Sequence, residues 1–171
     1  CHKAGIDYDR IIPVTPGGAA DIDAAFRAGE GRYVQQHGAF PQQLESDGIG
    51  HIVERVGPKI GPCAFSSLAA SREWLETEEA RAFVRAYKRA RQFLNEASAE
   101  EVAASEQSFF PDIAPQALTH CIAAYQDRGC WTPHVEITRE AFEVTLDVFQ
   151  YNSHINERYA YDQACCAPPA G

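Results

Sequence analysis

Residues 57–75, Gly57-Pro-Lys-Ile-Gly-Pro-Cys-Ala-Phe-Ser-Ser-Leu-Ala-Ala-Ser-Arg-Glu-Trp-Leu75, separate two parts of the chain that differ in character. Two Gly-Pro pairs open this segment. Because proline fixes φ and lacks an N–H while glycine leaves φ free, these pairs predict a change of direction between elements. Residues 63–68 alternate small and apolar side chains, which predicts a short buried strand, and Ser71 predicts the start of a helix. We therefore expect an α/β part before this segment and a helical part after it.

The part before residue 57 alternates strand and helix signals. Short apolar runs at 10–14, 31–36 and 50–56 predict strands, whereas 19–28 and 41–46 predict helices. Strands that alternate with helices through short loops predict a mostly parallel sheet. Such a sheet binds ligands at the carboxyl ends of its strands, where loops and helix N-termini present polar groups.

Two loops of this part contain the candidate binding residues. A Thr-Pro-Gly-Gly turn precedes the helix at 19–28, and its free N–H groups favour an anion or a polar ligand group. It is not a phosphate loop, because no G-K-[ST] follows and G-x-G-x-x-G is absent. Such a turn is by itself more often only a turn, and a lone histidine is more often a surface or core residue, so the position at a strand end carries the prediction. The candidates are Thr15, Gly17, Gly18, Gln36, His37 and Gly38.

Helix signals dominate the part after residue 75. Thr77 predicts the cap of a helix that runs to about residue 97, and Ser98 with Glu101 forms a capping box. Pro115 and Thr138 predict two further helix starts. The apolar stripes expected in the core are Phe83, Tyr87, Ala90 and Leu94; Leu118, Ile122 and Tyr125; and Phe142, Leu146 and Phe149. Because one strand cannot form a sheet, we expect the strand at 63–68 to pair with strands outside this sequence.

Composition excludes several partner classes. The 171 residues carry a formal net charge of −9, which disfavours nucleic acid and anionic membrane surfaces as partners. No apolar run approaches the ~18 residues that a membrane span needs.

The six cysteines lack zinc-site spacing, so we expect no metal and no cofactor, and we expect Cys63 and Cys121 to be buried as small apolar residues.

Several segments together resemble a known family. They are residues 64–75, 80–87, 110–113, 122–131 and 24–31. In their order they resemble the substrate-binding proteins of the nitrate/sulfonate/taurine class of ABC importers, a family that also contains thiamine-pyrimidine synthases. The resemblance covers most of the chain, roughly residues 3–161, and its motifs consist of packing residues and turns.

The resemblance implies a periplasmic-binding-protein-like (type II) fold of two α/β lobes. Residues 1–56 would form most of the second lobe, 57–62 the hinge crossover, 63–161 the C-terminal part of the first lobe, and 162–171 a tail. The opening half of the first lobe would precede Cys1. The residues expected to absorb or limit hinge rotation are Gly57, Pro58, Gly61 and Pro62.

The same resemblance implies a function. The chain would be the solute-binding component of an ABC-type importer, would close about its hinge on a small organic or anionic ligand, and would act with transporter membrane subunits in a periplasmic or other extracytoplasmic compartment. Phe65, Ser66 and Ser67 would face the same cleft as the two candidate loops. Gln36-His37 stands where sulfonate binders tend to place a Trp-Glu-Pro-like group, which disfavours a small sulfonate or nitrate and favours an aromatic, heterocyclic or carboxylate ligand.

Two alternatives remain open beside solute binding. One is an enzyme on the same fold, similar to thiamine-pyrimidine synthases or to desulfinases. Pyrimidine synthases of this family need a cysteine-rich iron-binding motif, whereas Cys165 and Cys166 lie in the tail of this chain. The other alternative is a ligand-sensing regulatory module.

Overall fold

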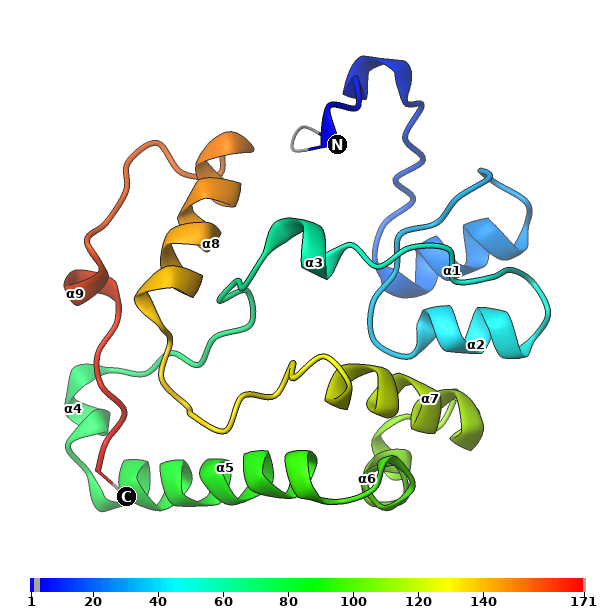
Figure 1. Cartoon of the computed structure of the whole chain (residues 1–171). Helices are drawn as coiled ribbons and strands as arrows, with labels where there is room; N and C mark the ends of the chain where they lie inside the picture. Colours follow the sequence, from blue (N-terminus) through cyan, green and yellow to red (C-terminus); the bar gives the residue numbers. More distant parts are fainter. Residues whose placement is uncertain (2–3, 171) are drawn as a thin grey trace. The chain divides into compact units, whose positions relative to one another are not determined.

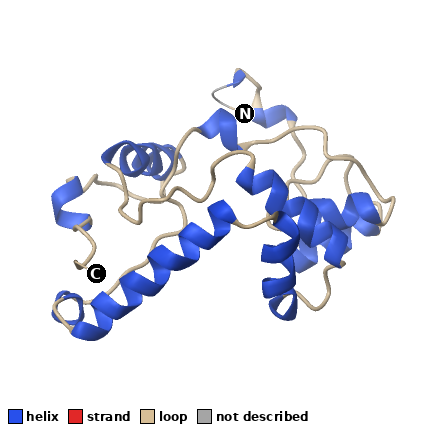
Figure 2. Ribbon diagram, turned by 60° about the horizontal axis from the view of Figure 1, so that its bottom comes forward, coloured by secondary structure: helices blue, strands red, loops and turns tan. Residues whose placement is uncertain are grey.

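A computed structural model describes residues 1 and 4–170 of the chain, and it folds them into helices and loops (Figures 1 and 2). No β-strand occurs among these residues. In chain order the elements are the 3-10 helix η2 (Tyr8–Arg10), α1 (Ala19–Arg27), α2 (Phe40–Ser46), α3 (Gly57–Ile60), α4 (Arg72–Leu75), α5 (Glu78–Glu96), α6 (Ala99–Glu106), the 3-10 helix η3 (Gln107–Phe109), α7 (Pro115–Gln126), α8 (Arg139–Tyr151) and α9 (Tyr161–Ala164).

The helical architecture overturns the expected α/β two-lobe fold of the periplasmic-binding-protein type. The four segments predicted as strands, 10–14, 31–36, 50–56 and 63–68, are loops within the described chain. A strand forms only when a neighbouring backbone accepts and donates its ladder hydrogen bonds, and no such ladder forms along these segments in the part of the chain that the structure describes. Their apolar side chains are consequently exposed, 92% for Ile12, 75% for Val53 and 76% for Phe65.

The predicted helices of the second half are confirmed, because their signals are local. The hydroxyl of Thr77 accepts a hydrogen bond from the N–H of Ala80 at 3.2 Å, at the start of α5. Ser98 and Glu101 form the predicted capping box of α6, and the hydroxyl of Thr138 caps α8. A cap satisfies N–H groups that the first helical turn leaves unpaired, so it fixes where a helix begins.

The described residues fall into two compact units. Unit 1 comprises residues 1–54 and 98–128, and unit 2 comprises 55–97 and 129–171. The chain therefore passes between units at Glu54, Ala97 and Arg128. The residues expected to form the hinge all belong to unit 2, where Gly57 to Ile60 form α3 and Gly61, with φ of +98°, follows its last turn.

Three helices build the core of unit 1. α7 packs against both α6 and α2 (Figure 1). The most deeply buried residues of these helices are Leu44, Val102, Ala117, Leu118 and Ile122. A polar contact aligns two of the helices, because the side-chain oxygen of Gln43 in α2 accepts a hydrogen bond from the N–H of Ala114 at 2.7 Å, at the cap of α7.

In unit 2 the buried face of α5 differs from the predicted one. Ala80 and Val84 are buried, whereas Phe83 is 45% exposed and Ala90 is exposed. The stripe that was expected at 83, 87, 90 and 94 is thus wrong in part, since two of its members face solvent. The ring of Phe83 instead contacts those of Trp74 and Tyr87, at centroid distances of 6.1 and 6.2 Å.

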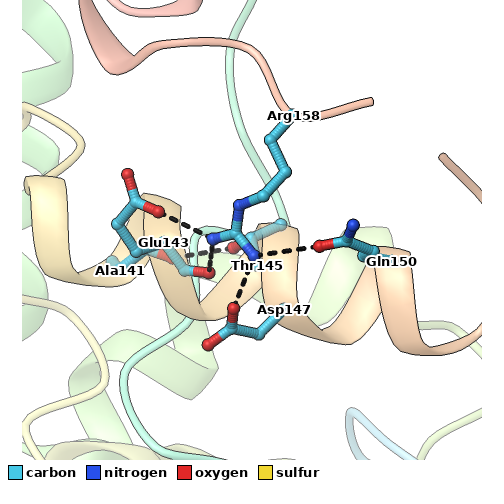
Figure 3. Close-up of polar contacts among 6 residues, drawn as sticks. All are labelled: Ala141, Glu143, Thr145, Asp147, Gln150 and Arg158. Atoms are coloured by element: carbon cyan, nitrogen blue, oxygen red, sulfur yellow. Dashed lines mark hydrogen bonds and ion pairs between the residues drawn. The ribbon is translucent and has the colours of Figure 1, made fainter. Parts of the chain in front are cut away.

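Arg158 attaches the segment 155–160, called the strap below, to α8 (Figure 3). Arg158 forms ion pairs with Glu143 at 2.7 Å and with Asp147 at 2.6 Å, and its guanidinium also donates to Gln150 at 3.3 Å. Glu143 and Asp147 are four residues apart on one helix, so their like charges repel each other. Arg158 offsets this repulsion and holds the strap on the helix.

Candidate ligand-binding site

The turn before α1 is shaped by two glycines. Gly17 has φ of +145°, a conformation that glycine adopts without a steric penalty. A Cβ atom at this position would lie 2.4 Å from Oδ2 of Asp21, so no larger residue fits the turn as it stands. The same Oδ2 accepts a hydrogen bond from the N–H of Gly18 at 2.9 Å. Gly18 is the N-cap of α1 and contributes no side-chain acceptor to the first N–H groups of the helix.

Gln36 joins this turn from seventeen residues further along the chain. Its Nε2 donates a hydrogen bond to the carbonyl oxygen of Ala19 at 2.6 Å, at the first residue of α1. Its Oε1 is buried and has no hydrogen-bond partner within the described part of the chain. A buried acceptor without a partner costs about 1–3 kcal/mol. A donor from outside the chain would remove that cost, which makes Gln36 the residue of this site best suited to bind a ligand.

His37 and Gly38 continue from Gln36 towards α2. His37 is exposed, whereas Gly38 has φ of +64° and leads into the buried Ala39. The thiol of Cys121, on α7, donates to the carbonyl oxygen of Gly38 at 3.1 Å. This contact fixes the loop 36–38 to the core of unit 1, so Gln36 lies on a loop that is anchored on both sides.

The charge around the site is negative. Unit 1 contains 13 acidic and 5 basic residues, a net charge of −8 out of the total of −9, whereas unit 2 contains 11 acidic and 10 basic residues. Behind the turn, Arg27 is paired with Asp23 at 2.6 Å and with Asp47 at 2.8 Å. Because Asp21 lies directly at the turn and Arg27 is occupied, the field disfavours an anion and favours a neutral or cationic ligand group.

The remaining sequence candidates lie elsewhere. Thr15 is exposed on the approach to the turn. Phe65, Ser66 and Ser67 belong to unit 2, where Phe65 is largely exposed and the Ser67 hydroxyl donates to the carbonyl of Ala64 at 3.0 Å. The structure therefore brings the turn and Gln36 together within unit 1, and it places 65–67 in the other unit.

Two residues of the site escaped sequence reasoning. Asp21 is the third residue of α1 after the N-cap Gly18. An acidic residue at this position is typical of a helix N-terminus, so the sequence contained a signal for it. Cys121 was expected to be buried, and it is 5% exposed. Its hydrogen bond to Gly38 joins residues 83 apart in sequence, and no local pattern indicates such a pair.

Comparison with known proteins yields one similarity at the level of sequence. The chain is similar to a protein of Bacillus subtilis (strain 168) described as "Putative binding protein YtlA", with 25% identity over 146 residues, which make up 84% of this chain and 44% of that protein. The chain thus spans less than half the length of this relative. No protein-family model matches the chain, and no solved structure matches it.

Two kinds of feature are absent from the described residues. None of their helices combines the length and the apolar character that crossing a membrane requires. No group of three or more His, Cys, Asp and Glu residues within this part of the chain is arranged to hold a metal ion.

Proposed function

We propose that this chain is a solute-binding component of an ABC-type importer, and that it binds a small organic ligand at the turn 15–18 and Gln36. The sequence similarity to a protein described as a binding protein supports the binding class. The observation that carries the site is the buried, unpartnered Oε1 of Gln36 beside the first turn of α1. The cleft between two α/β lobes belonged to the expected fold and is not part of this proposal.

The proposed ligand carries a hydrogen-bond donor. An N–H or O–H group would donate to Oε1 of Gln36, and the N–H groups at the start of α1 would donate to an acceptor atom of the same ligand. A heterocyclic amide or amine has both kinds of group. Nitrate and simple sulfonates have only acceptors, and the net charge of −8 in unit 1 disfavours them further.

We further propose that the ligand is bound and released unchanged, in an extracytoplasmic compartment, and is handed to membrane subunits of an importer. The enzyme and the regulatory module remain the competing functions. Recovery of the ligand after incubation separates binding from turnover, and only a transport component would stimulate uptake when it is added to membranes that contain the importer.

The test is a ligand screen by thermal unfolding of the whole chain. At a ligand concentration 100 times Kd, binding to the folded state adds about 2.7 kcal/mol to the unfolding free energy. We expect amines, amides and hydroxylated heterocycles to raise the Tm, and nitrate and alkanesulfonates to leave it unchanged. Stabilisation by the anions alone, or by no compound of either class, would contradict the proposal.

Two variants localise the site. Gln36→Ala removes the acceptor, and Gly17→Ala forces a methyl group into the space that Oδ2 of Asp21 occupies. We expect both to weaken binding at least tenfold, about 1.4 kcal/mol. Gln35→Ala is the matched control, because Gln35 has the same side chain, is exposed and precedes Gln36 directly. Unchanged binding in Gln36→Ala, or an equal loss in Gln35→Ala, would show that Gln36 is not a specific part of the site.

A further inference from the structure

Unit 2 contains a cavity that the proposed function does not use. Its volume is about 530 Å³, and it lies between α4, the first turns of α5 and the tail segment 166–170. Ligand sites in proteins commonly have volumes of about 300–1,000 Å³. The lining residues are Arg72, Glu73, Leu75, Glu76, Arg81, Cys166, Ala167, Pro169 and Ala170.

The four charged residues of the lining differ in how far their charge is already neutralised. Arg81 is paired with Glu78 at 3.4 Å. Glu73 accepts hydrogen bonds from its own N–H and from the Ser71 hydroxyl, and these lower its carboxyl pKa. In contrast, neither Arg72 nor Glu76 forms a side-chain hydrogen bond or an ion pair within the described chain, although the charge of Arg72 also helps to lower the carboxyl pKa of the adjacent Glu73. The cavity therefore offers one cation and one anion whose hydrogen-bonding groups are available to a ligand.

Arg72 and Glu76 are four residues apart, at the start of α4 and directly after its end. Side chains at this spacing lie on the same side of a helical turn. They do not form an ion pair with each other within the described chain, and both line the cavity. A planar guanidinium matches the geometry of a carboxylate, and a carboxylate accepts hydrogen bonds from an ammonium group.

The rest of the lining is apolar. Leu75 from α4 and the tail residues Ala167, Pro169 and Ala170 present hydrocarbon surface beside the charged pair. Unit 2 as a whole is close to neutral, with 11 acidic and 10 basic residues, so its field does not exclude either sign of charge. A ligand that fits needs both charges close together and an apolar group.

We propose that this cavity binds a zwitterionic α-amino acid or short peptide, with its carboxylate on Arg72, its ammonium group on Glu76 and its apolar part against Leu75 and Pro169. This site is separate from the one in unit 1 and does not depend on the proposed function. Both sites lie within single units, so each is tested by variants of its own residues.

Calorimetric titration of the whole chain with leucine, N-acetylleucine and leucinamide tests the proposal. N-acetylleucine lacks the positive charge and leucinamide lacks the negative one, while both keep the apolar side chain. We expect leucine to bind and each analogue to bind at least tenfold more weakly. No binding of leucine, or equal binding of all three compounds, would overturn the proposal.

Arg72→Gln and Glu76→Gln locate the binding site. Glu76→Gln removes the charge at nearly unchanged shape, and Arg72→Gln replaces the guanidinium by a shorter neutral amide. We expect each to weaken leucine binding about tenfold, with helical content by circular dichroism unchanged. Arg89→Gln is the matched control, because Arg89 is exposed on α5 and lies outside the lining. If Gln36→Ala abolished leucine binding and the two cavity variants did not, leucine would occupy unit 1. That result would overturn the present inference and leave the proposed function standing.

Discussion

The hydroxyl of Thr145 accepts a hydrogen bond from the N–H of Ala64 at 2.9 Å, across 81 residues of sequence. The same hydroxyl donates to the carbonyl of Ala141 at 2.8 Å, one turn earlier in α8 (Figure 3). Thr145 is 8% exposed, so water does not replace these bonds if they are lost. Thr145 therefore attaches the loop that follows α3 to α8.

Thr145→Val tests this attachment. Valine keeps the shape of threonine but removes the nearer acceptor of the Ala64 N–H, which keeps only the 3.2 Å bond to the carbonyl oxygen of Ala141. We expect this loss of one hydrogen bond to reduce the unfolding free energy by about 0.5–1.5 kcal/mol. Thr145→Ser keeps the hydroxyl and should lose less. Urea unfolding followed by circular dichroism measures both. Equal losses for the two variants would assign the effect to packing rather than to the hydrogen bond.

Truncation to alanine is predicted to destabilise the protein strongly at Leu118 and hardly at all at Val53. Leu118, 3% exposed, lies where α7 packs in unit 1, whereas Val53 is 75% exposed. Leu118→Ala should cost about 2–5 kcal/mol because it leaves a cavity. Val53→Ala should change stability by no more than about 0.5 kcal/mol. A large loss for Val53→Ala would indicate that the 50–56 segment is buried in solution.

Asp47 makes stability depend on pH in the acid range. Hydrogen bonds from Arg27, and then from Gln43, lower the pKa of its carboxyl below the ordinary value. A carboxyl whose folded pKa is depressed contributes stability that is present above the unfolded pKa and lost as pH falls through the folded one. We expect Asp47→Asn to flatten the dependence of stability on pH below about 4. Near neutral pH the slope of stability against pH should hardly change. A variant with the wild-type acid profile would contradict this role.

The thiol of Cys121 is predicted to be inert in the folded protein. Burial, and to a lesser degree the charge of Glu106, raise its pKa to about 11. Because the thiolate is the reactive species, alkylation near pH 8 should modify the exposed Cys166 first and leave Cys121 intact until the chain unfolds. Mass spectrometry of peptides after timed labelling, with and without urea, measures the order. Labelling of both thiols at one rate without urea would contradict the burial of Cys121.

Arg158 is predicted to hold the strap 155–160 through charge. Its ion pairs with Glu143 and Asp147 are partly exposed, so salt should weaken them. We expect Arg158→Gln to increase amide hydrogen exchange in the strap, and the wild-type strap to show the same increase at high salt. Arg139→Gln serves as a comparison, because Arg139 pairs with Asp162 at a longer distance, 3.2 Å, and at a more exposed position, and also lies over the ring of Tyr161. Unchanged exchange in Arg158→Gln would show that other contacts fix the strap.

Much of the helical structure could be predicted from the sequence, whereas the predicted sheet was wrong, because the described residues form no strand. Thr77, the Ser98–Glu101 box and Thr138 cap helices through bonds to residues at most three positions away. The same local reasoning assigned strands to 10–14 and 63–68, but a strand depends on a partner that local sequence does not reveal. Within the candidate site, the glycine turn was predicted, whereas the contact of Gln36 with Ala19 was not.

The sequence by itself determined where the longer helices begin, because caps and turns act over one helical turn of backbone. Tertiary structure alone decided which faces became buried, as in α5, where Ala80 and Val84 replace Phe83 in the interior. It also decided that Gln36 reaches the first turn of α1 and that Arg72 and Glu76 line a cavity with the tail. The physical reason is that these contacts join distant residues, and their free energies depend on every element that packs around them.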